Sequence, residues 1–198
     1  MLFVDGENFT IEGTKLAEKA GVSLVEGDCF KPGVYLWLPN RPPTNFPGLL
    51  DGTLQPHAER GYYYTATTGS TEVMTAVRDD LWKLGFEPKV FHKPDKNVKS
   101  KGVDITLSTD MLSHASHGNY DTALLVAGDG DYVPLVDEVK RIGRRVVVAF
   151  FSRGMNPELR RHSDLFFNLD DHLVGAWEVD AAQRERLKGL IASQVKPL

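Results

Sequence analysis

The sequence has very little cysteine, and it has no apolar run of membrane-spanning length. Its one cysteine, Cys29, excludes an internal disulfide framework and a zinc site built from several cysteines. The longest apolar runs are short, such as residues 146–151, whereas a membrane span needs about 20 apolar residues. The first residues lack the basic segment of a secretory signal and soon reach Asp5. These absences predict a soluble protein without a membrane partner in a reducing compartment, the cytoplasm.

An excess of positive charge is also absent. The 198 residues carry a formal net charge of −4, with a pI of about 5.9, whereas proteins that bind nucleic acid by bulk charge are basic. Contact with a nucleic acid would therefore depend on local basic patches around a compact site. The hydrophobic content of 41% is ordinary for a globular protein, and the length suffices for one large core.

Short apolar runs alternate with helical patterns along the chain. The strands are expected at residues 2–5, 33–38, 61–67, 87–94, 122–127, 144–151 and 165–170. The helices are expected at residues 8–21, 70–86, 103–116, 132–142, 156–162 and 180–192. Several strands are almost wholly apolar, which indicates a mainly parallel sheet covered on both faces. We therefore expect a three-layer α/β/α fold, in which ligands bind at the carboxyl ends of the strands.

Acidic side chains follow two of these strands where each strand ends. Asp5 ends the first strand, Asp129 and Asp131 follow the run "ALLVA", and Asp104 opens a helix after a lysine-rich loop. The carboxyl ends of parallel strands meet at one edge of a sheet, so we expect Asp5, Asp104 and Asp129 to converge there. Carboxylates that would otherwise repel one another are the ligands that Mg²⁺ prefers, and a divalent cation can activate water and stabilise charge on a phosphate.

The sequence resembles a known family over most of its length. The segments "LFVDGEN", "GYYYTA", "KGVDITLSTDML", "ALLVAGDGDYVPLVDEVKRIGRRVVVAFF" and "SDLFFNL" are similar, in this order, to the motifs of the NYN domain family within the PIN-like nuclease superfamily. The resemblance implies a flavodoxin-like sheet, an acidic metal-binding pocket and RNA as the substrate. It also implies an NYN domain over residues 1–170, followed by a C-terminal helical extension at 171–198. The proline-rich segment 39–57 departs from the family pattern by its length, and we expect it to be an insertion.

The resemblance also implies roles for single acidic residues. Asp5, Asp104 and Asp129 match the catalytic and metal-binding positions of the family, and Asp131 matches the second acid of its GDxD-like block. These four carboxylates would hold Mg²⁺ or Mn²⁺. Glu7 lies inside the first motif without an assigned role.

Four residues are expected to contact the substrate. Asn8 and Asp110 match further family positions, whereas Lys101 and Arg153 are candidates for phosphate contact because of where they lie in the sequence. Structural roles are open alternatives: Asn8 could cap the first helix, and Asp110 could be a solvated helix residue. Asp131 also fits an N-cap, because a proline follows within the first helical turn.

Two groups of surface-type residues have alternative interpretations. Lys93, Lys96, Lys99 and Lys101 form either a solvated loop or a phosphate-binding segment. The run Tyr62 to Tyr64 could stack on bases, although alternation in a strand predicts that one or two of these rings are buried.

Together these patterns predict a metal-dependent endoribonuclease-like enzyme that hydrolyses RNA. The alternative is a catalytically weak or inactive NYN module that binds RNA or a protein. A homodimer or a protein partner stays open in both cases.

Overall fold

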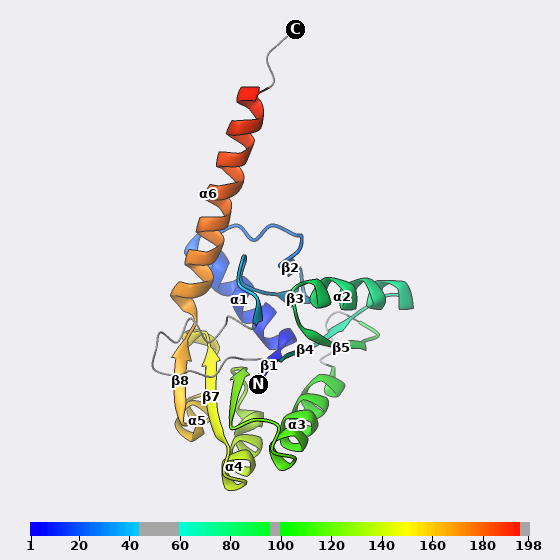
Figure 1. Ribbon diagram of the computed structural model, residues 1–198, viewed down its shortest axis with the longest axis vertical. Coiled ribbons are helices and arrows are strands. Elements are labelled where there is room, and N and C mark those ends of the chain that lie inside the picture. The colour runs from blue at the N-terminus through cyan, green and yellow to red at the C-terminus, as the bar shows by residue number, and fades with distance from the viewer. Residues whose placement is uncertain (44–59, 96–99, 195–198) are drawn as a thin grey trace.

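Figure 1 shows the fold of the computed structural model, in which helices cover both faces of one sheet. The structure describes residues 1–43, 60–95 and 100–194, without the side chains of Lys101 and of residues 189–194. The described residues form a sheet of six parallel strands in the order β5-β4-β1-β6-β7-β8. The α/β/α class expected from the sequence is confirmed.

The elements alternate along the chain as the apolar pattern predicts. The strands of the main sheet are β1 (Leu2–Asp5), β4 (Gly61–Thr67), β5 (Glu87–His92), β6 (Thr122–Val126), β7 (Arg145–Phe150) and β8 (Leu165–Asn168). The helices and 3-10 turns are α1 (Gly6–Ala20), α2 (Thr71–Lys83), α3 (Lys101–Ser116), η2 (Gly130–Tyr132), α4 (Val133–Arg141), η3 (Ser152–Gly154), α5 (Pro157–His162) and α6 (Asp170–Gln194).

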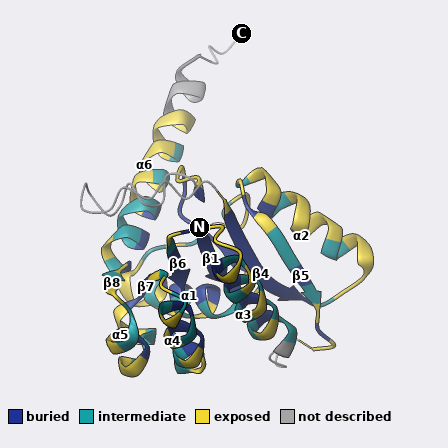
Figure 2. Cartoon of the chain, turned by 60° about the horizontal axis from the view of Figure 1, so that its bottom comes forward, coloured by how far each residue is buried: buried dark blue, intermediate teal, exposed yellow. Residues whose placement is uncertain are grey.

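Alternate residues of each strand enter one of two cores. Leu2 and Val4 face the core that contains side chains of α1, α2 and α6, whereas Phe3 faces the core formed with α3, α4 and α5. The inner strands are therefore apolar on both faces, and Figure 2 shows β1 and β4 as buried along their length.

The sheet order reverses direction at β1. From β1 the chain moves outward to β4 and β5, and it then crosses back to β6, β7 and β8 on the other side of β1. Val4 pairs with Tyr63 of β4 and with Val126 of β6, so β1 and β6 end within one residue of each other, whereas β4 continues beyond them to Thr67. In open α/β sheets the crevice beyond such a switch point is the usual ligand site.

The strand expected at residues 33–38 is wrong in extent and in partner. Only Tyr35–Leu36 forms a strand, β3, and it pairs antiparallel with β2 (Phe30–Lys31) outside the main sheet. The hydroxyl of Tyr63 accepts a hydrogen bond from the Leu36 backbone N–H and donates one to its carbonyl oxygen. The run is therefore apolar because it is buried against the core. The backbone N–H and carbonyl of Leu36 form hydrogen bonds without a neighbouring strand of the main sheet.

The C-terminal helix is longer than the expected 180–192. Helix α6 begins at Asp170, and its residues Leu173 and Trp177 are buried in the core that α1 lines. The later turns of α6 extend away from the body of the molecule (Figure 1). No helix of the described residues is long and apolar enough to cross a membrane.

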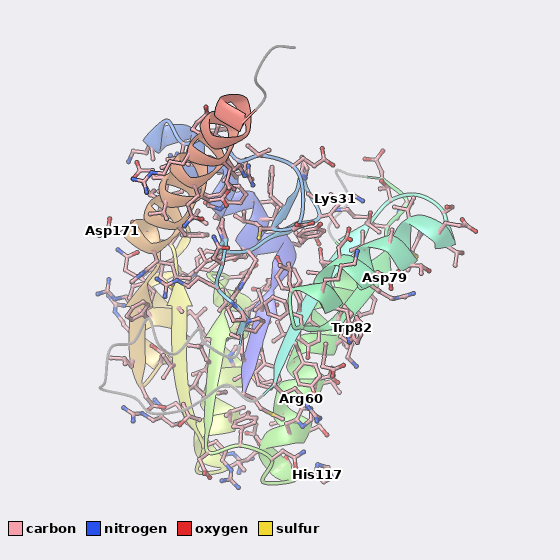
Figure 3. The ribbon with its side chains drawn as sticks, turned by 45° about the horizontal axis from the view of Figure 1, so that its top comes forward. Lys31, Arg60, Asp79, Trp82, His117 and Asp171 are labelled. Carbon is pink, nitrogen blue, oxygen red and sulfur yellow. The ribbon has the colours of Figure 1, made fainter. Side chains whose placement is uncertain are left out.

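Two apolar residues of the helices α2 and α3 are exposed. Trp82 of α2 is 71% exposed and Ile105 of α3 is 64% exposed. Figure 3 shows Trp82 on α2, one residue after the fully buried Leu81. One residue corresponds to about 100° of helical rotation, so Trp82 lies well away from the direction in which Leu81 is buried. Of the proline-rich segment, residues 44–57 lie outside the described residues.

Candidate active site

Asp5 ends the central strand and begins the first helix. It follows Phe3 by two residues, so its side chain lies on the face covered by α3 and α4. Its carboxylate is only 2% exposed and accepts a hydrogen bond from the Asn8 backbone N–H at 3.0 Å. Asp5 is therefore the N-cap of α1, which begins at Gly6, and the cap role expected for Asn8 is wrong.

Tyr132 joins Asp5 to Asp104. Its hydroxyl oxygen lies 3.1 Å from Oδ2 of Asp5 and 3.2 Å from Oδ1 of Asp104. The three residues come from β1, from the first turn of α3 and from the 3-10 turn before α4. The sequence-based expectation that Asp5 and Asp104 converge is thus met by a shared tyrosine hydroxyl.

The Tyr132 hydroxyl keeps its proton. Burial raises the pKa of Tyr132 well above its usual value, and the charges of Asp5 and Asp104 raise it further. A phenol hydroxyl carries one proton, so it can donate to only one of the two carboxylates at a time.

The cap expected at Asp131 is formed by Asp129 instead. Oδ1 of Asp129 accepts a hydrogen bond from the Asp131 backbone N–H at 3.1 Å, so Asp129 caps the 3-10 turn η2. Asp131 is exposed, and the helix α4 begins two residues later with Pro134 in its first turn. Aspartate side chains commonly accept a hydrogen bond from the backbone N–H two residues further on, and the Gly-Asp sequence that follows Asp129 permits this turn.

Asn8 links the first helix to the loop after β6. Its Oδ1 accepts a hydrogen bond from the Gly128 backbone N–H at 2.9 Å, and the Gly128 carbonyl accepts one from the Asn156 N–H at 2.8 Å. A Cβ atom at Gly128 would collide with the Gly154 carbonyl and the Phe150 ring. These contacts hold the switch-point loops together, and substrate contact by Asn8 stays a prediction.

Asp110 lies in a separate cluster on α3. It accepts a hydrogen bond from the Tyr64 hydroxyl at 3.0 Å and forms an ion pair with Lys89 at 3.5 Å. Tyr62, Tyr63 and Tyr64 are all buried, which removes them as stacking platforms for bases. These contacts of Asp110 are structural, and its contact with substrate stays a prediction.

Lys93 is buried in an ion pair with Glu7. The two charged atoms lie 2.6 Å apart, and the side chains are 6% and 12% exposed. This pair joins the segment after β5 to the first turn of α1. The sequence did not indicate the pair, because Lys93 belongs to a lysine-rich stretch that is typical of a solvated loop and Glu7 has no marked pattern.

The two candidate phosphate contacts differ in what the structure describes. Arg153 is an exposed residue of η3, the turn that follows β7 at the same edge of the sheet. Its neighbour Gly154 lies against Gly128 of the switch-point loop. Lys101 begins α3, but its side chain, like Lys96 and Lys99, lies outside the described part of the chain.

The donor atoms at this edge fit a hard divalent cation. Within the described residues, no three His, Cys, Asp or Glu side chains form a ready-made metal cluster. Mg²⁺, however, is commonly held by one or two carboxylates together with water and substrate phosphate. Asp5 and Asp104 supply two carboxylates at one point, and a ligand role for Asp129 or Asp131 stays a prediction.

Comparison with known proteins agrees with this architecture. A crystal structure of a protein of unknown function from Vibrio parahaemolyticus superimposes with a TM-score of 0.57, at 21% identity over 87% of this chain and 93% of that one. This likeness shows the fold alone. An uncharacterized protein of Methanocaldococcus jannaschii is 26% identical over 104 residues, which are 52% of this chain but only 37% of that protein.

A family model covers the whole region that carries the site. The model of the NYN domain matches residues 1–170, from the first strand to the start of α6. The matched region includes the joined carboxylates, the switch-point loop and the tyrosine that connects them. The chain therefore belongs to the NYN domain family, a family of PIN-like nuclease domains.

Proposed function

We propose that this protein is a metal-dependent ribonuclease that hydrolyses phosphodiester bonds of RNA at the Asp5–Asp104 pair. The observation that supports the proposal most is the contact of both carboxylates with one tyrosine hydroxyl at the switch point of the sheet. RNA as the substrate rests on membership of the NYN family. The site lies where open α/β sheets bind their ligands.

The residues of the chain have separate tasks in this proposal. Asp5 and Asp104 would hold Mg²⁺ or Mn²⁺, with Asp129 as a further ligand. When bound, the cation supplies positive charge that stabilises the reacting phosphate and lowers the pKa of water. One of the carboxylates takes the proton of the attacking water. The exposed Arg153 and the sequence-based candidate Lys101 contact the phosphate backbone.

The proposal is tested with single-stranded RNA, Mn²⁺ and the purified chain. The wild type is expected to cleave the RNA, and Asp104→Asn is expected to abolish cleavage because it removes a negative charge and keeps the shape. Asp79→Asn is the matched control, since Asp79 is an exposed residue of α2 (Figure 3). This control variant should cleave as the wild type does.

Two results would contradict the proposal. Cleavage by Asp104→Asn at the wild-type rate would remove the carboxylate pair from the reaction. RNA binding without any cleavage, unchanged by Mn²⁺, would instead support the inactive NYN module.

A further inference from the structure

The Tyr132 hydroxyl contacts both Asp5 and Asp104. Its ring is 2% exposed and packs in the core beneath α3, α4 and α5. The ring position is therefore set by the core and not by the carboxylates. The hydroxyl therefore has a fixed position, and carboxylates from two different elements contact it.

The hydroxyl also limits how the two carboxylates can rotate. Oδ1 of Asp5 accepts from the Asn8 backbone N–H and Oδ2 accepts from Tyr132, so both oxygens of Asp5 have a defined direction. Oδ1 of Asp104 lies at hydrogen-bond distance from the same hydroxyl, whose single proton alternates between the two carboxylates. Residues that are not ligands themselves often hydrogen-bond to metal ligands and orient them. Their removal commonly lowers metal affinity by about 10–100-fold.

We propose that Tyr132 is a positioning residue that presets the Asp5 and Asp104 carboxylates for one divalent cation. The inference rests on the proposed cation site, and it assigns a role to a residue outside the acidic set. Without the hydroxyl, the two carboxylates lose their common donor and turn away from one another. The cation must then reorient both groups before it binds, so its affinity falls.

The test measures Mn²⁺ binding to the full chain in the absence of RNA, by calorimetry or by the spin resonance signal of free Mn²⁺. The variant Tyr132→Phe keeps the buried ring and removes only the hydroxyl. It is expected to weaken Mn²⁺ binding by about 10–100-fold relative to the wild type. Raising the Mn²⁺ concentration by the same factor should restore RNA cleavage by the variant. Its rate at saturating Mn²⁺ should be close to that of the wild type.

Tyr120→Phe is the matched control. Tyr120 is also a buried tyrosine of the same core, 6% exposed, but its hydroxyl donates to the Met111 carbonyl oxygen at 2.9 Å. This variant loses a buried tyrosine hydrogen bond whose acceptor is a backbone carbonyl and not a carboxylate of the pair. Its Mn²⁺ affinity should equal that of the wild type, and its thermal unfolding shows what a lost tyrosine hydroxyl alone does to stability.

The outcomes separate the two proposals. Unchanged or tighter Mn²⁺ binding by Tyr132→Phe overturns the positioning role, even where RNA cleavage depends on Asp104. Equal weakening by Tyr120→Phe also overturns it, because the effect is then one of stability. A specific loss of Mn²⁺ affinity in Tyr132→Phe, together with no RNA cleavage by the wild type, keeps the positioning role and overturns the nuclease assignment. Absence of Mn²⁺ binding by the wild type overturns both the positioning role and the cation site.

Discussion

At the scale of single residues, Asp129 has a structural role that can be separated from any role in catalysis. Its carboxylate caps η2 through the Asp131 N–H. Asp129→Ala should lower the free energy of unfolding by about 1 kcal/mol, whereas Asp129→Asn keeps the cap acceptor and the stability. Urea denaturation of both variants measures the cap.

The same pair of variants then isolates the chemistry. If Asp129 is a ligand of the cation, Asp129→Asn loses RNA cleavage at wild-type stability. Full cleavage by Asp129→Asn would show that the cap is its only role.

Cys29 offers a test of the electrostatics between the β2 region and α6. Burial, together with the nearby Asp180 and Asp28 carboxylates, raises the pKa of the Cys29 thiol to about 11. Only the thiolate reacts with disulfide reagents, so at pH 8 Cys29 should react roughly 100-fold more slowly in the folded chain than in urea. The rate should rise about tenfold per pH unit up to pH 11, which stopped-flow absorbance can follow. A folded-state rate equal to that in urea would contradict this.

The joining of Asp5 and Asp104 could be predicted from the sequence, whereas the role of Tyr132 could not. Two carboxylates at ends of elements on one sheet edge follow from strand order and family motifs alone. A hydrogen bond from Tyr132 depends on the path of η2 and on the packing of the ring, neither of which leaves a periodic pattern. The reversed cap has the same cause, since Asp129 and Asp131 are equally suited to cap by residue type.

At the scale of elements, the Lys93–Glu7 pair fixes α1 to the end of β5. Lys93→Met leaves the carboxylate of Glu7, which is 12% exposed, without its partner. We expect a loss of about 3 kcal/mol in the free energy of unfolding, measured by urea denaturation. The double variant with Glu7→Gln should regain part of this loss.

An exposed pair supplies the control for this change. Lys83 and Asp80 of α2 form an ion pair with side chains 69% and 34% exposed. Lys83→Met should change stability by less than about 0.5 kcal/mol. Equal effects at Lys93 and Lys83 would show that burial of the first pair carries no energetic weight.

Elements with a clear period are the ones that the sequence predicted. The apolar runs of β1, β4, β6 and β7 and the pattern of α2 led to the expected strands and helix because their burial follows strand or helix geometry. The strand predicted from the apolar run at 33–38 is wrong because the backbone N–H and carbonyl of Leu36 form hydrogen bonds with the Tyr63 hydroxyl of β4. Apolarity alone cannot distinguish these two ways of being buried.

At the scale of the whole molecule, the buried core extends further along the chain than the region that the family model matches. The match ends at residue 170, but Leu173 and Trp177 are 1% and 2% exposed in the core, and the Trp177 ring contacts Phe30 edge-on. A chain cut after residue 170 should lose at least the ~3–5 kcal/mol typical of removing a buried tryptophan. A chain cut after residue 188 keeps both side chains and should unfold close to the full-length temperature.

Thermal unfolding of the two truncated chains decides the boundary. Equal stability of both would support the domain limit at residue 170 that the sequence analysis expected. A large difference would extend the folding unit into α6.

The central position of β1 has a consequence for how the chain folds. β1 lies between two strands that come much later in the chain: Leu2 pairs with Gly61 on one side and with Leu124 on the other. Such distant pairings raise the contact order, and folding slows because long loops must close before the contacts form. The hydrogen bond between Tyr132 and Asp5 spans 127 residues, so it cannot form until Tyr132 has been synthesised. In a nascent chain β1 can pair first with β4, and the acidic site forms only after β6 and η2 have followed on the other side of β1.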